Sequence, residues 1–83
     1  MTILKKKKYL KVSHNPKLKV IIGYKIRALR VHRDMTMADL AVRSGLSLSM
    51  VSKIENGKTS ASLTTLHKLS KTFSVPISTF FSG

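Results

Sequence analysis

The 83-residue chain has no cysteine, no tryptophan and only two prolines. The absence of cysteine excludes disulfide scaffolds and cysteine-based zinc sites. The three histidines (His14, His32 and His67) have no partner at metal-ligand spacing, so we expect neither a metal nor another cofactor. No apolar run approaches the roughly 18 residues of a membrane span, and the first residues lack the apolar region of a signal peptide. These absences predict a cytoplasmic protein without a membrane role.

Acidic residues are also scarce, because Asp34, Asp39 and Glu55 are the only carboxylate side chains. The sequence contains no glycine-rich phosphate loop and no nucleophile elbow. With so few groups suited to acid-base or nucleophilic chemistry, we do not expect an enzyme.

Basic residues, in contrast, are abundant: sixteen Lys and Arg give a formal net charge of +13. Residues 1–33 carry eleven of them and no acid. A field of this sign attracts polyanions such as nucleic acid, an anionic membrane surface or an acidic protein. Charge alone does not choose among these partners.

The sequence divides into a basic arm, residues 1–18, and a folded domain, residues 19–83. The pair Asn15-Pro16 indicates a break between them. Much of the arm's charge comes from four consecutive lysines, Lys5, Lys6, Lys7 and Lys8. The arm could contact DNA phosphates, could be an inert flexible tail, or could be ordered by a protein partner. We favour contact with the DNA backbone.

Apolar spacing predicts an all-α domain. Ile22, Ile26 and Leu29 recur on one helical face, which predicts a first helix from about Leu18 to Arg33-Asp34. Helix-capping residues then precede three further helices. We predict these helices from Thr36 to Ser44, from Ser47 to Asn56-Gly57 and from Ser62 to Val75-Pro76, with one more helical turn over Ile77 to Phe81.

The Asn56-Gly57 pair has a second interpretation, a tight hairpin turn between strands at Met50–Ile54 and Thr59–Leu63. The flanking residues alternate poorly between apolar and polar, and Ser47 is a better start for a helix than for a strand. The helical interpretation is therefore preferred.

The second and third predicted helices are short and are joined by a tight turn at Gly45, which is the geometry of a helix-turn-helix. On the third helix, Val51 and Ile54 share one side and are predicted to be buried. The opposite side carries short polar residues and one cation, which suit the edges of bases in a major groove. An amphipathic helix with a merely solvated outer face is the alternative.

The residues that support this interpretation also resemble those of a known family. They are Ile26 to Arg30, Thr36, Leu40-Ala41, Gly45-Leu46-Ser47, Val51 to Gly57, Ser62-Leu63, Leu66, Leu69 and Val75-Pro76. At this spacing the sequence is similar to the lambda-repressor/Cro-like helix-turn-helix domain of the xenobiotic-response-element family. The resemblance implies a compact five-helix fold, homodimeric binding to a two-fold symmetric operator in double-stranded DNA, and transcriptional regulation.

The resemblance also assigns roles to individual residues. It implies that the base-facing positions are Leu48, Ser49, Ser52 and Lys53. It implies that the phosphate-contacting positions are Ser47, Asn56, Lys58 and Thr59. Glu55 matches an acid that pairs with an arginine late in the first helix, here Arg30. Leu48 has two interpretations, packing on a thymine methyl or an isolated apolar side chain at the surface.

The sequence departs from the family pattern at three positions. Met37 replaces a glutamine that bonds phosphate, so a side-chain clamp at this position is not expected. Asp34 stands where the turn between the first two helices commonly has glycine, and Ala61 replaces a proline before Ser62.

Apolar residues near the end of the chain predict a dimer interface. It would comprise Val75, Pro76, Phe80 and Phe81, which a monomer of this size has difficulty covering. The alternative is that the two phenylalanines close the core of the monomer.

We therefore predict a nucleoid-associated DNA-binding regulator. It could act alone, as the DNA-binding half of a larger regulator, or as a controller of a restriction–modification operon. The alternative from another class is an antitoxin that binds a partner protein through the arm.

Overall fold

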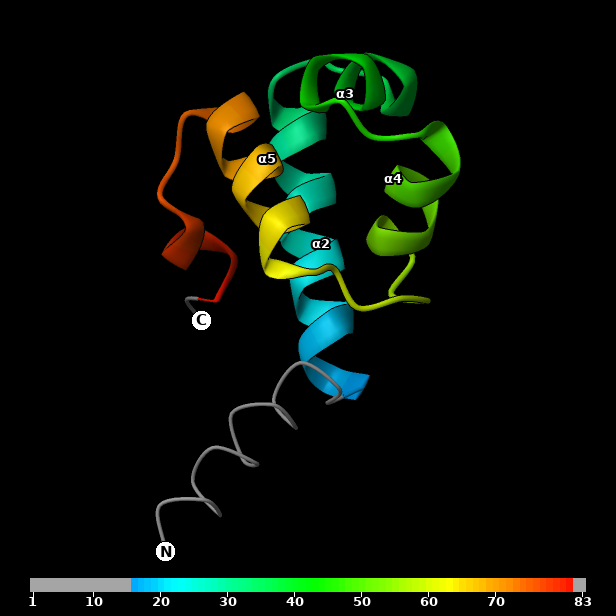
Figure 1. The fold of residues 1–83 in the computed structure, drawn as a ribbon, viewed down its shortest axis with the longest axis vertical. Helices are drawn as coiled ribbons and strands as arrows, with labels where there is room; N and C mark the ends of the chain where they lie inside the picture. Colours follow the sequence, from blue (N-terminus) through cyan, green and yellow to red (C-terminus); the bar gives the residue numbers. More distant parts are fainter. Residues whose placement is uncertain (1–15, 82–83) are drawn as a thin grey trace, which may run out of the picture.

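The computed structural model describes residues 16–81, and the four arm lysines predicted to bind phosphate lie outside this range. The described chain forms four α-helices and one 3-10 helix (Figure 1). They are α2 (Pro16–His32), α3 (Met37–Ser44), α4 (Leu48–Glu55), α5 (Leu63–Phe73) and η1 (Ile77–Phe80). The prediction of an all-α domain is confirmed, although the last of the five expected α-helices is a 3-10 turn.

Residues 16–18, placed in the arm from the sequence, are helical and are the first described residues of α2. The boundary between arm and domain after residue 18 stays a prediction, because residues 1–15 lie outside the described range.

All three predicted caps are present. At the start of α3, the Asp39 backbone N–H donates to Thr36 Oγ1 over 3.0 Å and the Thr36 N–H donates to Asp39 Oδ2 over 2.9 Å, which completes a capping box. Ser47 Oγ accepts from the Met50 N–H at the start of α4, and Ser62 caps α5 in the same way. These bonds fix where three of the four helices begin.

The chain reverses at four residues in the left-handed backbone region. Gly45 and Gly57 have φ of 73° and 67°, which glycine adopts at little cost. Asp34 and Ser74 have φ of 55° and 56°, although neither is glycine. Because α4 is helical through Glu55 and Asn56 caps it, the hairpin interpretation of Asn56-Gly57 is wrong.

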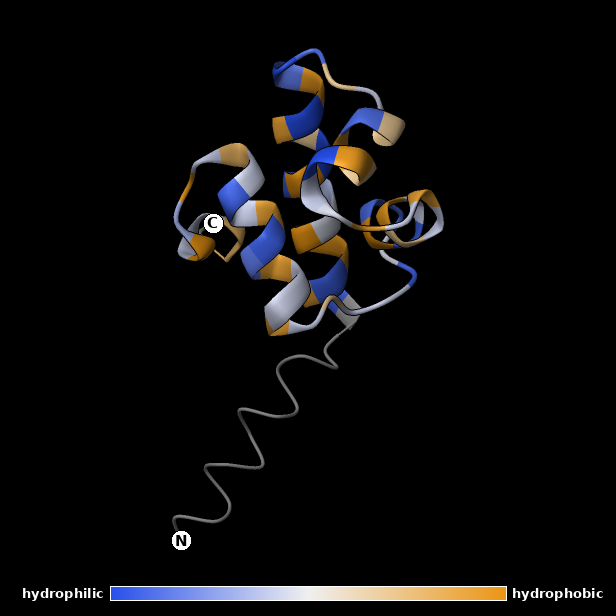
Figure 2. Ribbon diagram, turned by 45° about the horizontal axis from the view of Figure 1, so that its top comes forward, coloured by the Kyte–Doolittle hydropathy of each residue, from blue (hydrophilic) through white to orange (hydrophobic). Residues whose placement is uncertain are grey.

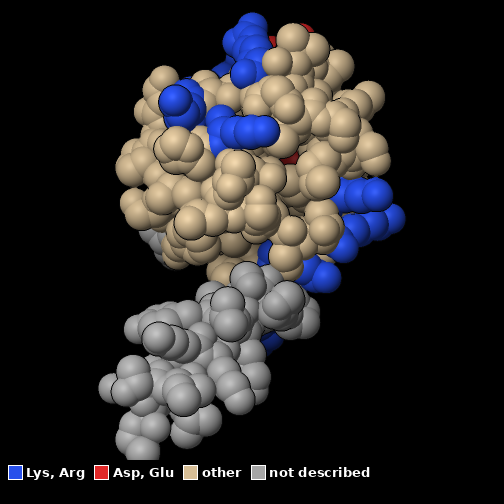
Figure 3. Space-filling model, in the orientation of Figure 1, with Lys and Arg blue, Asp and Glu red and all other residues tan. Residues whose placement is uncertain are grey.

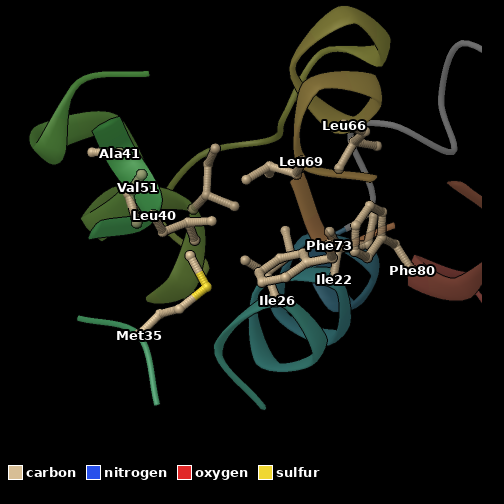
Figure 4. Close-up of a cluster of buried hydrophobic side chains, with 11 residues drawn as sticks. Ile22, Ile26, Met35, Leu40, Ala41, Val51, Leu66, Leu69, Phe73 and Phe80 are labelled. Atoms are coloured by element: carbon tan, nitrogen blue, oxygen red, sulfur yellow. The ribbon is translucent and has the colours of Figure 1, made fainter. Parts of the chain in front are cut away.

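Helix α2 lies between α4 and α5, with α3 across the top of the view in Figure 1. The helices carry hydrophobic and hydrophilic residues on different sides (Figure 2), and the apolar sides meet in one core (Figure 4). The core residues are Ile22, Ile26, Met35, Leu40, Ala41, Val51, Ile54, Leu66, Leu69, Phe73 and Phe80. Within residues 16–81, no helix has the length and apolarity required to cross a lipid bilayer.

Candidate nucleic-acid interface

One side of α4 packs into the core and the other is open to solvent. Val51 and Ile54 are each 2% exposed, as their spacing predicts. Leu48, Ser49 and Lys53 are exposed, and Ser52 is half-buried. The four residues expected to face bases thus lie together on one accessible flank of α4. The major groove of B-DNA is wide enough to admit an α-helix.

The carboxyl end of α4 is joined to α2 by an ion pair. Arg30 Nε donates to Glu55 Oε2 over 2.6 Å, and Arg30 Nη2 donates to Glu55 Oε1 over 2.9 Å. The two side chains are 13% and 3% exposed. The hydrogen bond to Glu55 favours the charged guanidinium and raises the pKa of Arg30 above its ordinary value. The predicted pairing is present in the structure, and its fork geometry fixes direction as well as distance.

Arg30 has a third contact, because its Nη1 donates to the Met35 carbonyl over 2.8 Å. Met35 is buried in the turn between α2 and α3. One guanidinium therefore holds together the end of α2, the entry to α3 and the end of α4.

Gly23 allows α2 to approach the same end of α4. A Cβ at this position would lie 2.2 Å from the Ile54 carbonyl oxygen and 3.0 Å from that of Glu55. No side chain fits there without moving backbone, so the close approach requires glycine. The sequence reading missed this residue, although a glycine within an otherwise helical pattern is the available signal for a close packing contact.

The loop after α4 holds the positions expected to contact phosphate. Asn56 and Lys58 are exposed and Thr59 is half-buried. Asn56 Nδ2 donates to the Ser52 carbonyl over 2.9 Å, and the Lys58 backbone N–H donates to the Lys53 carbonyl over 2.9 Å. These bonds fold the loop back onto α4, so its polar groups lie beside the flank of that helix.

Met37 is the first residue of α3, at the position where a side-chain contact to phosphate is not expected. Met37 is half-buried and packs against the core. The cap Ser47, by contrast, is exposed at the start of α4, where its hydroxyl already accepts from the Met50 N–H. Its hydroxyl hydrogen remains available for donation to an anion.

The expected dimer residues separate into two groups. Phe80 is fully buried in the core and offers no surface to a partner, so its placement at an interface is corrected. The cause is η1, which turns this side chain inward toward α2 and α5. Pro76 is exposed, Val75 is half-buried and Phe81 is 47% exposed.

Phe81 borders an apolar hollow of about 220 Å³ that the sequence did not reveal. Its apolar lining consists of Leu18, Ile22, Ile54, Ala61, Leu63, Leu66 and Phe81. Leu63, at the start of α5, is 72% exposed. The accessible apolar surface near the end of the chain is therefore centred on Leu63 and Phe81.

Over residues 16–81, the structure brings together no group of three histidine, aspartate or glutamate side chains able to hold a metal ion. Lysine and arginine side chains dominate the visible charge instead, with few acidic atoms among them (Figure 3). The chemistry available at the surface is binding by hydrogen bonds and positive charge.

The sequence of this chain matches a known protein family. A helix-turn-helix family model (HTH_3) matches residues 26–80, which span α3, the turn and α4. The chain belongs to the helix-turn-helix family. This membership confirms the resemblance seen in the sequence and agrees with a DNA-binding protein that is not an enzyme.

Two relatives of this helix-turn-helix chain come from Bacillus subtilis (strain 168). The HTH-type transcriptional repressor RghR is 40% identical over 55 residues, and the HTH-type transcriptional regulator RghRB is 44% identical over 55 residues. Each match covers 65% of this chain but only 41% and 40% of the respective relative. The chain therefore spans about two fifths of the length of those relatives.

Solved structures share the same helix arrangement. The restriction-modification controller protein C.AhdI from Aeromonas hydrophila superposes with a TM-score of 0.73 at 30% identity, covering 76% of this chain and 96% of the controller. An HTH_3 family transcriptional regulator from Vibrio cholerae has a TM-score of 0.76 at 29% identity, covering 80% of this chain and 37% of that protein. The helix-turn-helix fold thus occurs both nearly alone and as part of longer chains.

Proposed function

We propose that the chain is a sequence-specific DNA-binding transcriptional regulator that acts in the cytoplasm. The observation that carries this proposal is the geometry of α4, whose polar flank is exposed while its opposite side and its carboxyl end are fixed to the rest of the domain. Leu48, Ser49, Ser52 and Lys53 face the bases in this proposal. Ser47, Asn56, Lys58 and Thr59 contact phosphates.

Lys53 and Lys58 provide a matched test, because both are exposed lysines and they differ in their place on the interface. A preferred duplex is first selected from a random DNA pool. Lys53→Ala is expected to lose about 1–3 kcal/mol on that duplex and to relax preference at one position, because lysine can bond guanine in the major groove. Lys58→Ala is expected to weaken preferred and random duplexes alike. Equal losses on both duplexes for Lys53→Ala would contradict its role in base recognition.

The regulator is proposed to act as a homodimer on a palindromic site with half-sites about 34 Å apart. Leu63 and Phe81 support this, because two exposed apolar side chains beside a hollow form a surface that a second copy can cover. Val75 and Pro76 remain in the proposed interface and Phe80 does not. Sedimentation of Leu63→Lys and Phe81→Lys variants tests this, with Val42→Lys as control because Val42 is an exposed apolar residue on α3. Dimers that persist in both variants would place the interface elsewhere.

The arm is proposed to follow the DNA backbone through Lys5, Lys6, Lys7 and Lys8. If these four lysines and one more touch phosphates, removal of residues 2–15 makes the negative slope of log K against log salt less steep by roughly 4 to 5. An unchanged slope would assign the arm to another role, such as binding a protein partner.

A restriction–modification controller is the second candidate role. The observation in its favour is the match to C.AhdI, which covers 96% of that controller within a single domain. The DNA selected from the random pool separates the two roles. A controller is expected to prefer a site next to genes for a restriction enzyme and a methyltransferase in the source genome.

A further inference from the structure

A second basic surface lies on α3 and α5, away from the proposed DNA flank of α4. Arg43 at the end of α3 and Lys68 and Lys71 on α5 surround a hollow of about 310 Å³, together with Ser44 and Thr72. In Figure 1, α5 and α4 lie on opposite sides of α2. Figure 3 shows lysine and arginine side chains on the front face over α3 and α5 as well as on the edge next to α4.

Hydrogen bonds hold the elements that carry these three cations. The Thr72 hydroxyl donates to the Lys68 carbonyl over 2.9 Å and lies 3.5 Å from the Arg43 carbonyl oxygen. The Ser44 hydroxyl is occupied by the Leu40 carbonyl, at 2.6 Å. The two hydroxyls therefore support the backbone, and the charged groups of Arg43, Lys68 and Lys71 are the donors that face the hollow.

Within residues 16–81, no ion pair joins Lys68 or Lys71 to a carboxylate. Among residues 16–81, the structure has one salt bridge, between Arg30 and Glu55, and it includes none of the three. Asp39, one turn before Arg43, interacts with the charge of Arg43, but the hydrogen bond from the Thr36 N–H has the larger effect on the pKa of its carboxylate. Lys68 and Lys71 repel each other at a spacing of three residues, and this repulsion lowers the stability of α5 unless an anion relieves it.

We propose that Arg43, Lys68 and Lys71 form a second phosphate-binding surface, which holds a second DNA duplex or a distant segment of the same DNA. The hollow has no apolar side chain in its lining. A protein partner needs an apolar centre for affinity, whereas phosphate contacts are made by lysine, arginine and small polar residues. The composition of the lining therefore selects phosphate over an acidic protein. The proposal goes beyond the proposed function, because it makes each domain a link between two DNA segments.

A capture assay on the full chain tests the proposal. The protein is bound to an immobilised copy of the preferred duplex selected from the random pool, and a second, fluorescent duplex is added. The double variant Lys68→Gln and Lys71→Gln is expected to bind the immobilised duplex like wild type and to capture the second duplex roughly tenfold or more weakly, because two phosphate contacts are lost. The matched control is the double variant Lys19→Gln and Lys25→Gln, which removes the same charge from α2 and keeps the capture.

The outcomes separate this proposal from the proposed function. A protein that fails to bind the immobilised duplex overturns both. Binding of the first duplex without capture of the second overturns the second surface alone, as does equal loss of capture in the α5 and α2 variants. Poly-glutamate that displaces the second duplex more effectively than free DNA of equal charge identifies an acidic polypeptide as the ligand and overturns the assignment to phosphate.

Discussion

The two ends of α4 are held in different ways. At the carboxyl end, Glu55 is paired with Arg30, Gly23 lets α2 pack directly on the Ile54 carbonyl, and both side chains of the ion pair are largely removed from solvent. At the amino end, Leu48 is half exposed, and the hydrogen bond from the Met50 N–H to Ser47 Oγ caps the start of the helix.

This difference suits a helix that must enter a groove. The carboxyl end sets the position and direction of α4 relative to the domain, and the amino end can then extend outward without being covered. Mutations at the two ends are therefore expected to act differently: those at the anchored end reduce stability, and those at the open end mainly affect binding.

The largest effect is expected from Arg30→Met. The substitution leaves the Glu55 carboxylate, whose side chain is 3% exposed, without its partner. Removing one member of a buried pair costs about 3–5 kcal/mol. Urea denaturation measures the change, and Arg27→Met, at an exposed position of the same helix, is the control. A loss no greater than that of the control would show that the anchored end does not depend on the ion pair.

Gly23→Ala is expected to have the next largest effect. Alanine normally favours a helix over glycine, but here its Cβ would lie 2.2 Å from the Ile54 carbonyl oxygen. The overlap forces α2 and α4 apart and costs about 1–3 kcal/mol. Thermal unfolding measures it, with Arg27→Ala as a control in which alanine meets no such contact. If Gly23→Ala instead stabilises the protein, α2 and α4 can move apart to accommodate the Cβ without loss of stability.

Ser47→Ala tests the open end. Loss of the hydroxyl that caps α4 is expected to cost about 1 kcal/mol of stability, because one helix N–H loses its acceptor. DNA affinity is expected to fall further, because the same hydroxyl is proposed to contact phosphate. Ser49→Ala, two residues further along the chain on the exposed flank, should leave stability unchanged. A Ser47→Ala protein with wild-type stability would show that the first turn of α4 needs no cap.

The smallest effect concerns the capping box of α3, at the Thr36–Asp39 pair. The Thr36 N–H, and after it the Thr36 hydroxyl, stabilise the carboxylate and lower the pKa of Asp39 below its ordinary value. Because the folded-state pKa is the lower one, the contribution of Asp39 is present above the ordinary pKa and is lost as the pH falls toward the folded-state value. Urea midpoints measured between about pH 5 and pH 2 are expected to decline less for Asp39→Asn than for wild type. If the urea midpoints of the two proteins fall in parallel as the pH is lowered, Asp39 does not contribute to the pH dependence of stability.

Local signals in the sequence predicted the helix starts well. Thr36, Ser47 and Ser62 cap helices because a serine or threonine before an apolar run satisfies N–H groups that no other part of the helix can bond. The positions of Arg30 and Glu55 followed from the family resemblance. The identity of the exposed flank of α4 followed from the helical period and the burial of Val51 and Ile54.

Features that depend on packing between distant segments were not predicted. Phe80 and Phe81 are adjacent and chemically identical, and only the direction of η1 decides that one is buried and the other exposed. The contact of Gly23 with α4 joins residues that are far apart in the chain. The grouping of Arg43 with Lys68 and Lys71 likewise depends on how α3 and α5 cross. Sequence periodicity does not predict contacts between residues that are far apart in the chain.

Gly45 and Gly57 share a left-handed backbone and differ in their surroundings. A Cβ at Gly45 would meet no atom within 4 Å, whereas one at Gly57 would lie 2.9 Å from Val20 Cγ2. Asparagine tolerates this backbone region, so the first turn can accept it and the second cannot without displacing Val20. During evolutionary drift, position 45 is therefore expected to alternate between glycine and asparagine among homologues, while position 57 remains invariant wherever a bulky residue occupies position 20.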